Sequence, residues 1–162
     1  MASITNRTFD ELSIGDFCIR EHTVTEKDLI LFAAVSGDLN PVHLDAAFAA
    51  NTPFKGQIAH GMFTGALISA ALAMQLPGPG SIYLGQNLAF KKPVKIDDQL
   101  TVKLTIADKH PKKPVVTLDC TVTNQKDEVV ASGDATVLAP TEKVTIDTPD
   151  MPNVQIEQAS EV

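Results

Sequence analysis

The segment SGDLNPVHLD, residues 36–45, gathers acid–base and hydrogen-bonding side chains around a single proline. Asp38 and His43 lie on either side of a bend at Asn40-Pro41, so neither helix nor strand periodicity fixes their separation. At neutral pH a carboxylate is ionised and an imidazole is mostly neutral, so the two can hold one water molecule between them. One group then removes a proton from the water while the other delivers a proton to a substrate. Taken singly, Asp38 also suits a backbone cap and His43 an ordinary loop histidine.

A second group of chemically useful residues surrounds the start of an apolar stretch. No Asp, Glu, Lys or Arg occurs between positions 56 and 90. Gly61 begins a predicted helix there, and its free backbone N–H at the positive helix end can polarise a carbonyl oxygen. Close packing explains the glycine equally well, and His60 is ambiguous in the same way. Ser69, eight residues on, needs a partner for its hydroxyl or bonds back to a helix carbonyl.

The elements around the acid–base segment are short. Thr25 and Asp28 resemble a capping box, and the apolar run that follows predicts a helix over residues 26–35. Residues 37–44 are expected to form an irregular, fixed loop. Asp45 then caps a second short helix, AAFAAN.

The segment GMFTGALISAALAMQL predicts a longer helix that ends at Pro77-Gly78. Its sixteen residues reach about 24 Å, less than the roughly 30 Å of a bilayer core, so we expect a buried helix and no membrane span. Alternating apolar residues predict the strands Leu100–Ile106 and Val116–Val122, and further strands are predicted at Phe17–His22, Ser81–Phe90 and Val129–Leu138. Cys120 falls with the apolar set, which favours a core side chain. The expected plan is α+β: a curved antiparallel sheet wrapped around one central buried helix.

Composition narrows the class of protein. The 162 residues are 44% hydrophobic, which fits one domain, here placed at residues 1–140. A net charge of −7 argues against nucleic-acid binding, and the two distant cysteines lack the spacing of a zinc site or redox pair. No basic stretch followed by an apolar run opens the chain, so a cytoplasmic location is expected. Residues 141–162 carry five acids and one lysine and form an acidic tail, either partly disordered or packed as an arm on the domain.

Three segments together resemble a known family. They are Ser36-Gly37-Asp38-Leu39-Asn40-Pro41-Val42-His43, Ala59-His60-Gly61-Met62 and Gly80-Ser81-Ile82-Tyr83-Leu84-Gly85-Gln86, and they are similar to the signature segments of the (R)-specific enoyl-CoA hydratases of the MaoC-like dehydratase family. The resemblance spans roughly residues 10–138. It implies a hot-dog fold, a homodimer and syn addition of water to trans-2-enoyl-CoA, giving (R)-3-hydroxyacyl-CoA without a metal or redox cofactor. The product would serve fatty-acid oxidation or polyhydroxyalkanoate supply.

The resemblance also implies roles for individual residues. Asp38 and His43 would bind and activate the water, and the Gly61 N–H would polarise the thioester carbonyl. Ser69 would support the pair through a hydrogen bond, and Asn40 would hold the loop. Which member of the pair protonates the α-carbon stays open.

Positive charge for the CoA phosphates is expected from the most basic stretch of the chain, residues 91–113. The candidates are Lys91, Lys92 and Lys95, followed by Lys109, Lys112 and Lys113, although any single lysine there also suits a solvated strand face. Residues Met62, Leu67, Leu72 and Met74 are possible liners of an acyl tunnel, with core packing as the alternative for each.

Two other functions use the same residues. An acyl-CoA thioesterase on the same fold would direct water at the thioester carbonyl and release a thiol, and Gly61 would serve either reaction. A non-catalytic acyl-CoA-binding partner is the third possibility, but it leaves the intact acid–base loop unexplained.

Overall fold

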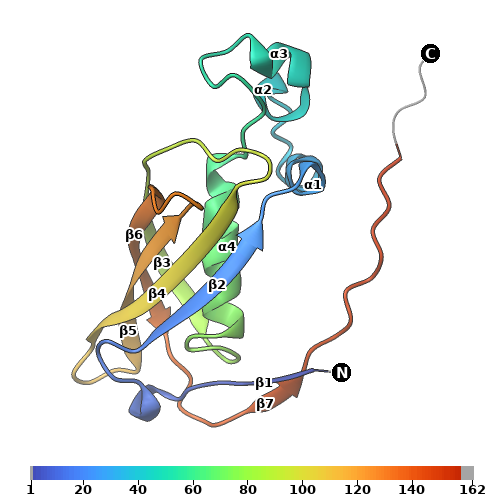
Figure 1. Ribbon diagram of the computed structural model, residues 1–162. Helices are drawn as coiled ribbons and strands as arrows, with labels where there is room; N and C mark the ends of the chain where they lie inside the picture. The colour runs from blue at the N-terminus through green and yellow to red at the C-terminus, as the bar shows by residue number, and fades with distance from the viewer. Residues whose placement is uncertain (1, 158–162) are drawn as a thin grey trace.

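The computed structural model describes residues 2–157. Five antiparallel strands form the main sheet in the order β2-β4-β5-β6-β3, and the helices lie between β2 and β3 in the sequence. The strands are β2 (Phe17–Thr23), β3 (Ile82–Phe90), β4 (Gln99–Lys109), β5 (Val115–Thr123) and β6 (Val129–Leu138). The helices are α1 (Glu26–Ser36), α2 (Pro41–Leu44), α3 (Ala46–Ala50) and α4 (Gly61–Met74). In Figure 1, α4 runs along one face of this sheet, and the three short helices gather at the end where α4 begins. The α+β hot-dog arrangement expected from the sequence is confirmed.

Alternation along the strands builds the core, as predicted. Leu104 of β4 pairs with Cys120 of β5, and both side chains are at most 1% exposed. The intervening threonines and lysines face away from α4, because successive strand residues point to opposite sides of a sheet. Cys120 is therefore a core side chain, as expected. Its burial raises the pKa of the thiol to about 11, so the thiol is an inert nucleophile.

Helix α4 is buried on one side only, so the expectation of all-round burial is wrong for a single chain. Its inner face packs against the sheet through residues such as Phe63, Leu67 and Ile68. Its outer face is a stripe of exposed or half-exposed residues at helical spacing: Met62, Ala66, Ser69 and Ala73. We call these four residues the outer stripe. A single sheet can cover only one face of a helix, so the outer stripe of α4 stays exposed.

The acid–base segment is more ordered than predicted. Gly37 ends α1 in the left-handed conformation, with φ of 76°. Residues 41–44 were expected in an irregular loop but form helix α2, because Pro41 suits the first helical position and the Asn40 side chain accepts from Val42 N–H at 3.1 Å. Only the stretch from Gly37 to Asn40 is irregular.

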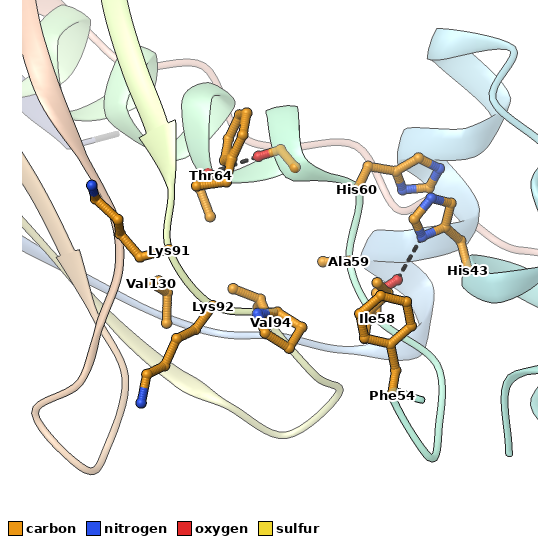
Figure 2. Close-up of a pocket in the computed structure, with 13 residues that line it drawn as sticks. His43, Phe54, Ile58, Ala59, His60, Thr64, Lys91, Lys92, Val94 and Val130 are labelled. Atoms are coloured by element: carbon orange, nitrogen blue, oxygen red, sulfur yellow. Dashed lines mark hydrogen bonds between the residues drawn. The ribbon is translucent and has the colours of Figure 1, made fainter. Parts of the chain in front are cut away.

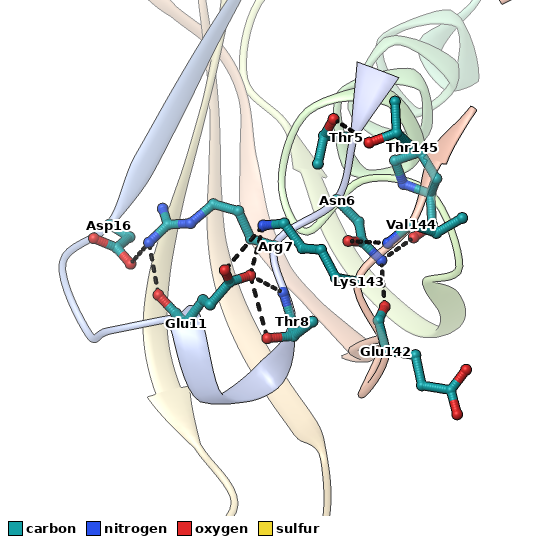
Figure 3. Close-up of polar contacts among 11 residues, drawn as sticks. Thr5, Asn6, Arg7, Thr8, Glu11, Asp16, Glu142, Lys143, Val144 and Thr145 are labelled. Carbon is teal, nitrogen blue, oxygen red and sulfur yellow. Dashed lines mark hydrogen bonds and ion pairs between the residues drawn. The ribbon is translucent and has the colours of Figure 1, made fainter. Parts of the chain in front are cut away.

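The chain does not leave the domain at residue 140. Strand β7 (Thr145–Asp147) pairs with β1 (Ser3–Thr5), and Figure 3 shows the buried Asn6 side chain between them and the neighbouring backbone. Its amide donates to the carbonyls of Pro79 and Glu142 and accepts from Val144 N–H. We call β1, β7 and Asn6 the terminal clasp.

The packed-arm interpretation of the acidic tail therefore describes its first part. Residues 148–157 continue without helix or strand, and the Lys27 ammonium of α1 donates to the Val154 carbonyl. The last five residues of the predicted tail, 158–162, lie outside the described residues. Among the helices that the structure describes, none has the length and apolar character needed to cross a bilayer.

Candidate active site

The turn after α1 and the short helix α2 bring Asp38 and His43 together, as the sequence predicted. Asp38 Oδ2 and His43 Nε2 are 3.7 Å apart. His43 is 8% exposed, and its Nδ1 lies 2.7 Å from the carbonyl oxygen of Ile58. A carbonyl only accepts, so Nδ1 of His43 carries a proton and Nε2 is the nitrogen that faces Asp38. The 3.7 Å gap is too long for a strong direct hydrogen bond and suits a shared water.

The two carboxylate oxygens of Asp38 have different surroundings. Its Oδ1 accepts from Asn40 N–H at 3.1 Å, which is the backbone-cap role, while Oδ2 faces His43. The Ser36 hydroxyl accepts from Asp38 N–H at 3.2 Å. The loop is therefore fixed by its own short-range bonds, and Asn40 contributes to holding it from both its backbone and its side chain.

His60, which the sequence left ambiguous, touches both members of the pair. Its Nε2 lies 3.0 Å from the Asp38 carbonyl oxygen, and its ring stacks on His43 with centroids 3.7 Å apart. One side-chain oxygen or nitrogen atom from each of Asp38, His43 and His60 lies within 4.8 Å of the other two. Divalent metal ions bind such combinations of carboxylate oxygen and imidazole nitrogen. The metal-free site implied by the family resemblance stays a prediction.

Gly61 opens onto the same cavity as His43. This cavity, about 330 Å³ in volume, lies between the start of α4 and the chain that follows β3 (Figure 2). As the first residue of α4, Gly61 has a backbone N–H with no partner inside the helix. A Cβ at this position would lie 3.4 Å from the Phe90 ring. A side chain would thus fit there in ordinary contact, and the Gly61 N–H has no hydrogen-bond partner among residues 2–157, so its carbonyl-polarising role stays a prediction.

Two of the predicted CoA-binding lysines line this cavity. Lys91 and Lys92 do so, and Lys92 also pairs with Glu128 at 2.5 Å. Lys95 lies outside the cavity lining, next to a backbone bridge to Ile58, so its CoA role stays a prediction. Lys109 is occupied elsewhere, because its ammonium donates to the carbonyls of Phe9 and Leu12.

Ser69 opens onto a second, more apolar cavity of about 500 Å³, between α1, α4 and β3. Within residues 2–157 its hydroxyl makes no hydrogen bond to Asp38 or His43, so its supporting role stays a prediction. Met62 lines this cavity as expected of a tunnel residue, whereas Leu67 packs in the core and Met74 lies outside both cavities.

The two cavities have no lining residue in common, but one ring contact links them. Phe32 lines the apolar cavity, and its ring packs against His60 with centroids 5.1 Å apart. His60 and His43 in turn line the cavity that holds Lys91 and Lys92. Through Phe32 and His60, the apolar cavity is therefore one side-chain contact away from the cavity that His43 and the two lysines line.

Comparison with known proteins decides the family. The model of the MaoC-like domain matches residues 18–129. The chain belongs to the MaoC-like family. This MaoC-like protein is 42% identical over 134 residues to the (R)-specific enoyl-CoA hydratase of Rhodospirillum rubrum, a match that covers 82% of this chain and 91% of the relative. It is 43% identical over 132 residues to the 3-hydroxybutyryl-CoA dehydratase of Methylorubrum extorquens, covering 82% and 83%.

Solved structures agree with this assignment. The unliganded R-hydratase PhaJ1 of Pseudomonas aeruginosa matches the MaoC-like chain with a TM-score of 0.94 and 49% identity, over 96% of this chain and 100% of that one. The (R)-hydratase of Aeromonas caviae matches with a TM-score of 0.78 and 40% identity, over 80% of this chain and 98% of that one.

Proposed function

We propose that this chain is an (R)-specific enoyl-CoA hydratase that adds water to trans-2-enoyl-CoA and gives (R)-3-hydroxyacyl-CoA, reversibly. The carrying observation is the Asp38 carboxylate oxygen 3.7 Å from the His43 imidazole nitrogen, next to the unpaired N–H of Gly61. Relatives at 42% and 43% identity are a hydratase and a dehydratase of acyl-CoA substrates, which are the two directions of one reaction.

The geometry supplies each part of the reaction. Water held between Asp38 and His43 loses a proton to one of them as its oxygen bonds to C3 of the substrate. The C2–C3 double bond opens, and C2 takes a proton from the same pair. Both additions come from one side, which gives syn stereochemistry. Negative charge on the thioester oxygen is stabilised by the Gly61 N–H and the positive end of α4.

The two cavities suggest how the substrate lies. Lys91 and Lys92 attract the phosphates of CoA to the cavity that they line, while the alkyl chain runs toward the apolar cavity beside Met62 and Ser69. Each methylene buried there contributes about 0.8 kcal/mol.

The enzyme works as a homodimer in this proposal. Strand β3 is an edge of the sheet, and its Ile82, Leu84 and Phe90 side chains are 51–55% exposed. Leu84 lines the apolar cavity together with Met62, Ala66 and Ser69 of the outer stripe. An exposed apolar edge beside an exposed apolar helix face is a surface that soluble proteins cover, and an antiparallel edge is self-complementary.

Sedimentation tests the dimer. Wild-type protein at micromolar concentration is expected at twice the 17.3 kDa of one chain. Leu84→Glu on β3 should produce a monomer, while Ile19→Glu on β2 should not. A monomeric wild type, or equal effects of the two variants, would refute this assignment.

We place the reaction in cytoplasmic acyl-CoA metabolism, in fatty-acid oxidation or in precursor supply for polyhydroxyalkanoate. The Aeromonas caviae relative is described as an (R)-hydratase involved in biosynthesis of that polymer.

The catalytic test follows the loss of enoyl-thioester absorbance with trans-2-butenoyl-CoA and identifies the product with an (R)-specific dehydrogenase. Asp38→Asn and His43→Gln are each expected to lower kcat by about 10²–10⁴-fold, the range of acid–base groups. Asp45→Asn is the matched control, because Asp45 caps α3 and does not face the pair. Full activity of Asp38→Asn would refute the mechanism. Release of free thiol in step with substrate loss would identify a thioesterase, and tight binding without turnover a binding protein.

A further inference from the structure

His60 occupies a helix position that it does not use in the ordinary way. It is the N-cap of α4, where Ser, Thr, Asp or Asn usually accept a bond from the first turn, yet its side chain makes no capping bond. It is only 4% exposed. The side chain is directed instead at the acid–base loop, which is 22 residues earlier in the sequence.

Its contacts fix the state of the ring. The Asp38 carbonyl oxygen, 3.0 Å from Nε2, only accepts, so Nε2 of His60 carries the proton. Nδ1 is buried and has no hydrogen-bond partner among residues 2–157. The two contacts together identify Nε2 as the nitrogen of His60 that donates, and leave Nδ1 without a donor role.

The imidazole ring of His60 also packs against the ring of His43 and restricts its movement. The two imidazoles stack with an interplanar angle of 24°, and Figure 2 shows them face to face. Phe32 backs His60, and the Ile58 carbonyl holds His43 from another direction. His43 is therefore prevented from rotating, and the backbone of Asp38 is held to the same support.

We propose that His60 is a positioning residue that holds Asp38 and His43 in reacting geometry, because its imidazole bonds the backbone of one and stacks on the ring of the other. This inference rests on the proposed hydratase function. It predicts that His60 affects turnover only through the pair.

Two variants separate its two contacts. His60→Phe keeps a ring for stacking and loses the bond to the Asp38 carbonyl, whereas His60→Gln keeps an N–H donor and loses the stacked ring. Each is expected to lower kcat with trans-2-butenoyl-CoA by about 10–100-fold, as for a sub-ångström to 1 Å misplacement of reacting groups, and to change KM by less than about threefold. His22→Phe is the matched control. His22 pairs with Asp28 at 2.9 Å and packs on Phe63, so this variant should lower the unfolding temperature and preserve kcat.

A double-mutant cycle distinguishes positioning from simple structural support. In the Asp38→Asn background, His60→Phe is expected to cost less than about threefold in kcat, because the pair on which it acts is already broken. The same loss in both backgrounds would overturn the proposal, and so would unchanged kcat in the single variants.

Nitrogen NMR of the imidazoles gives a readout that does not depend on turnover. Folded wild type is expected to show His60 protonated at Nε2 and His43 protonated at Nδ1, assigned from single-histidine variants among the four histidines. His60 protonated at Nδ1, or in rapid exchange between tautomers, would refute the proposal even in an active enzyme. The expected tautomers in a protein without hydratase activity would leave the positioning geometry standing and remove the proposed function.

Discussion

Replacing Asn6 by Ala is a quantitative test of the terminal clasp. The side chain is 1% exposed and makes three bonds to backbone groups, with lengths of 3.1, 2.9 and 3.0 Å. Alanine would leave two carbonyls and one N–H without these partners. At about 1 kcal/mol net for each hydrogen bond, the free energy of unfolding should fall by about 3 kcal/mol. For a chain of this length that corresponds to a decrease of about 6–12 °C in Tm.

The chain has no tryptophan and one tyrosine, so far-ultraviolet circular dichroism during urea and thermal unfolding is the suitable assay. Thr5→Ala is the matched control, because it removes a single exposed hydroxyl contact to Thr145 and should cost less than about 0.5 kcal/mol. Hydratase kcat at 20–25 °C should be unchanged in Asn6→Ala, since α4 separates the clasp from Asp38 by about 20 Å of helix. A loss below about 1 kcal/mol would show that the clasp opens without affecting the domain. A large loss of kcat in the folded variant would contradict this expectation, because it would show that the terminal clasp and the Asp38 site are coupled.

Three further outcomes can be measured. The Lys143 ammonium lowers the pKa of Glu11 from 4.5 to about 2. This contact therefore stabilises the fold above pH 4.5, and its contribution is lost as the pH falls toward 2. Glu11→Gln should lower Tm at pH 7, and the difference in Tm from wild type should vanish near pH 2. Lys91→Ala combined with Lys92→Ala should raise KM for enoyl-CoA about tenfold with kcat nearly unchanged, and should weaken the salt dependence of kcat/KM. Ala66→Met should fill part of the apolar cavity and lower kcat/KM for long enoyl-CoA substrates while sparing trans-2-butenoyl-CoA; equal effects on both chain lengths would exclude this cavity as the acyl site.

Local rules predicted the elements well. The helix expected over 26–35 is Glu26–Ser36, with the Thr25 hydroxyl accepting from Asp28 N–H as its capping signal indicated. The strands predicted from alternating apolar residues are confirmed. Residues two apart in a strand lie on the same face of the sheet, so only one register buries the apolar set against α4. The meeting of Asp38 and His43 was also predictable, since both sit on one short bend.

Contacts between distant segments were not predictable. His60 reaches the acid–base loop only because the chain folds back after α3, and no spacing in the sequence records that return. Ser69 lies two turns along α4 on the apolar cavity, and its expected support of the pair stays a prediction. The short helix α2 was not predicted because Pro41 was interpreted as part of a bend. Proline also suits the first position of a helix, which is the position it takes here.

The terminal clasp has a consequence for the order in which the molecule is completed. The Aeromonas caviae structure is matched over 98% of its length but covers 80% of this chain, so about a fifth of this chain has no counterpart there. Strand β1 is among the first residues made, and its partner β7 begins at Thr145. At roughly 5–20 residues per second, the ribosome needs about 7–30 s between the two. The five-stranded sheet is complete at Leu138, before that partner exists. The residues of β7 are therefore made after those of all five strands of the main sheet, and the clasp can close only once they are available.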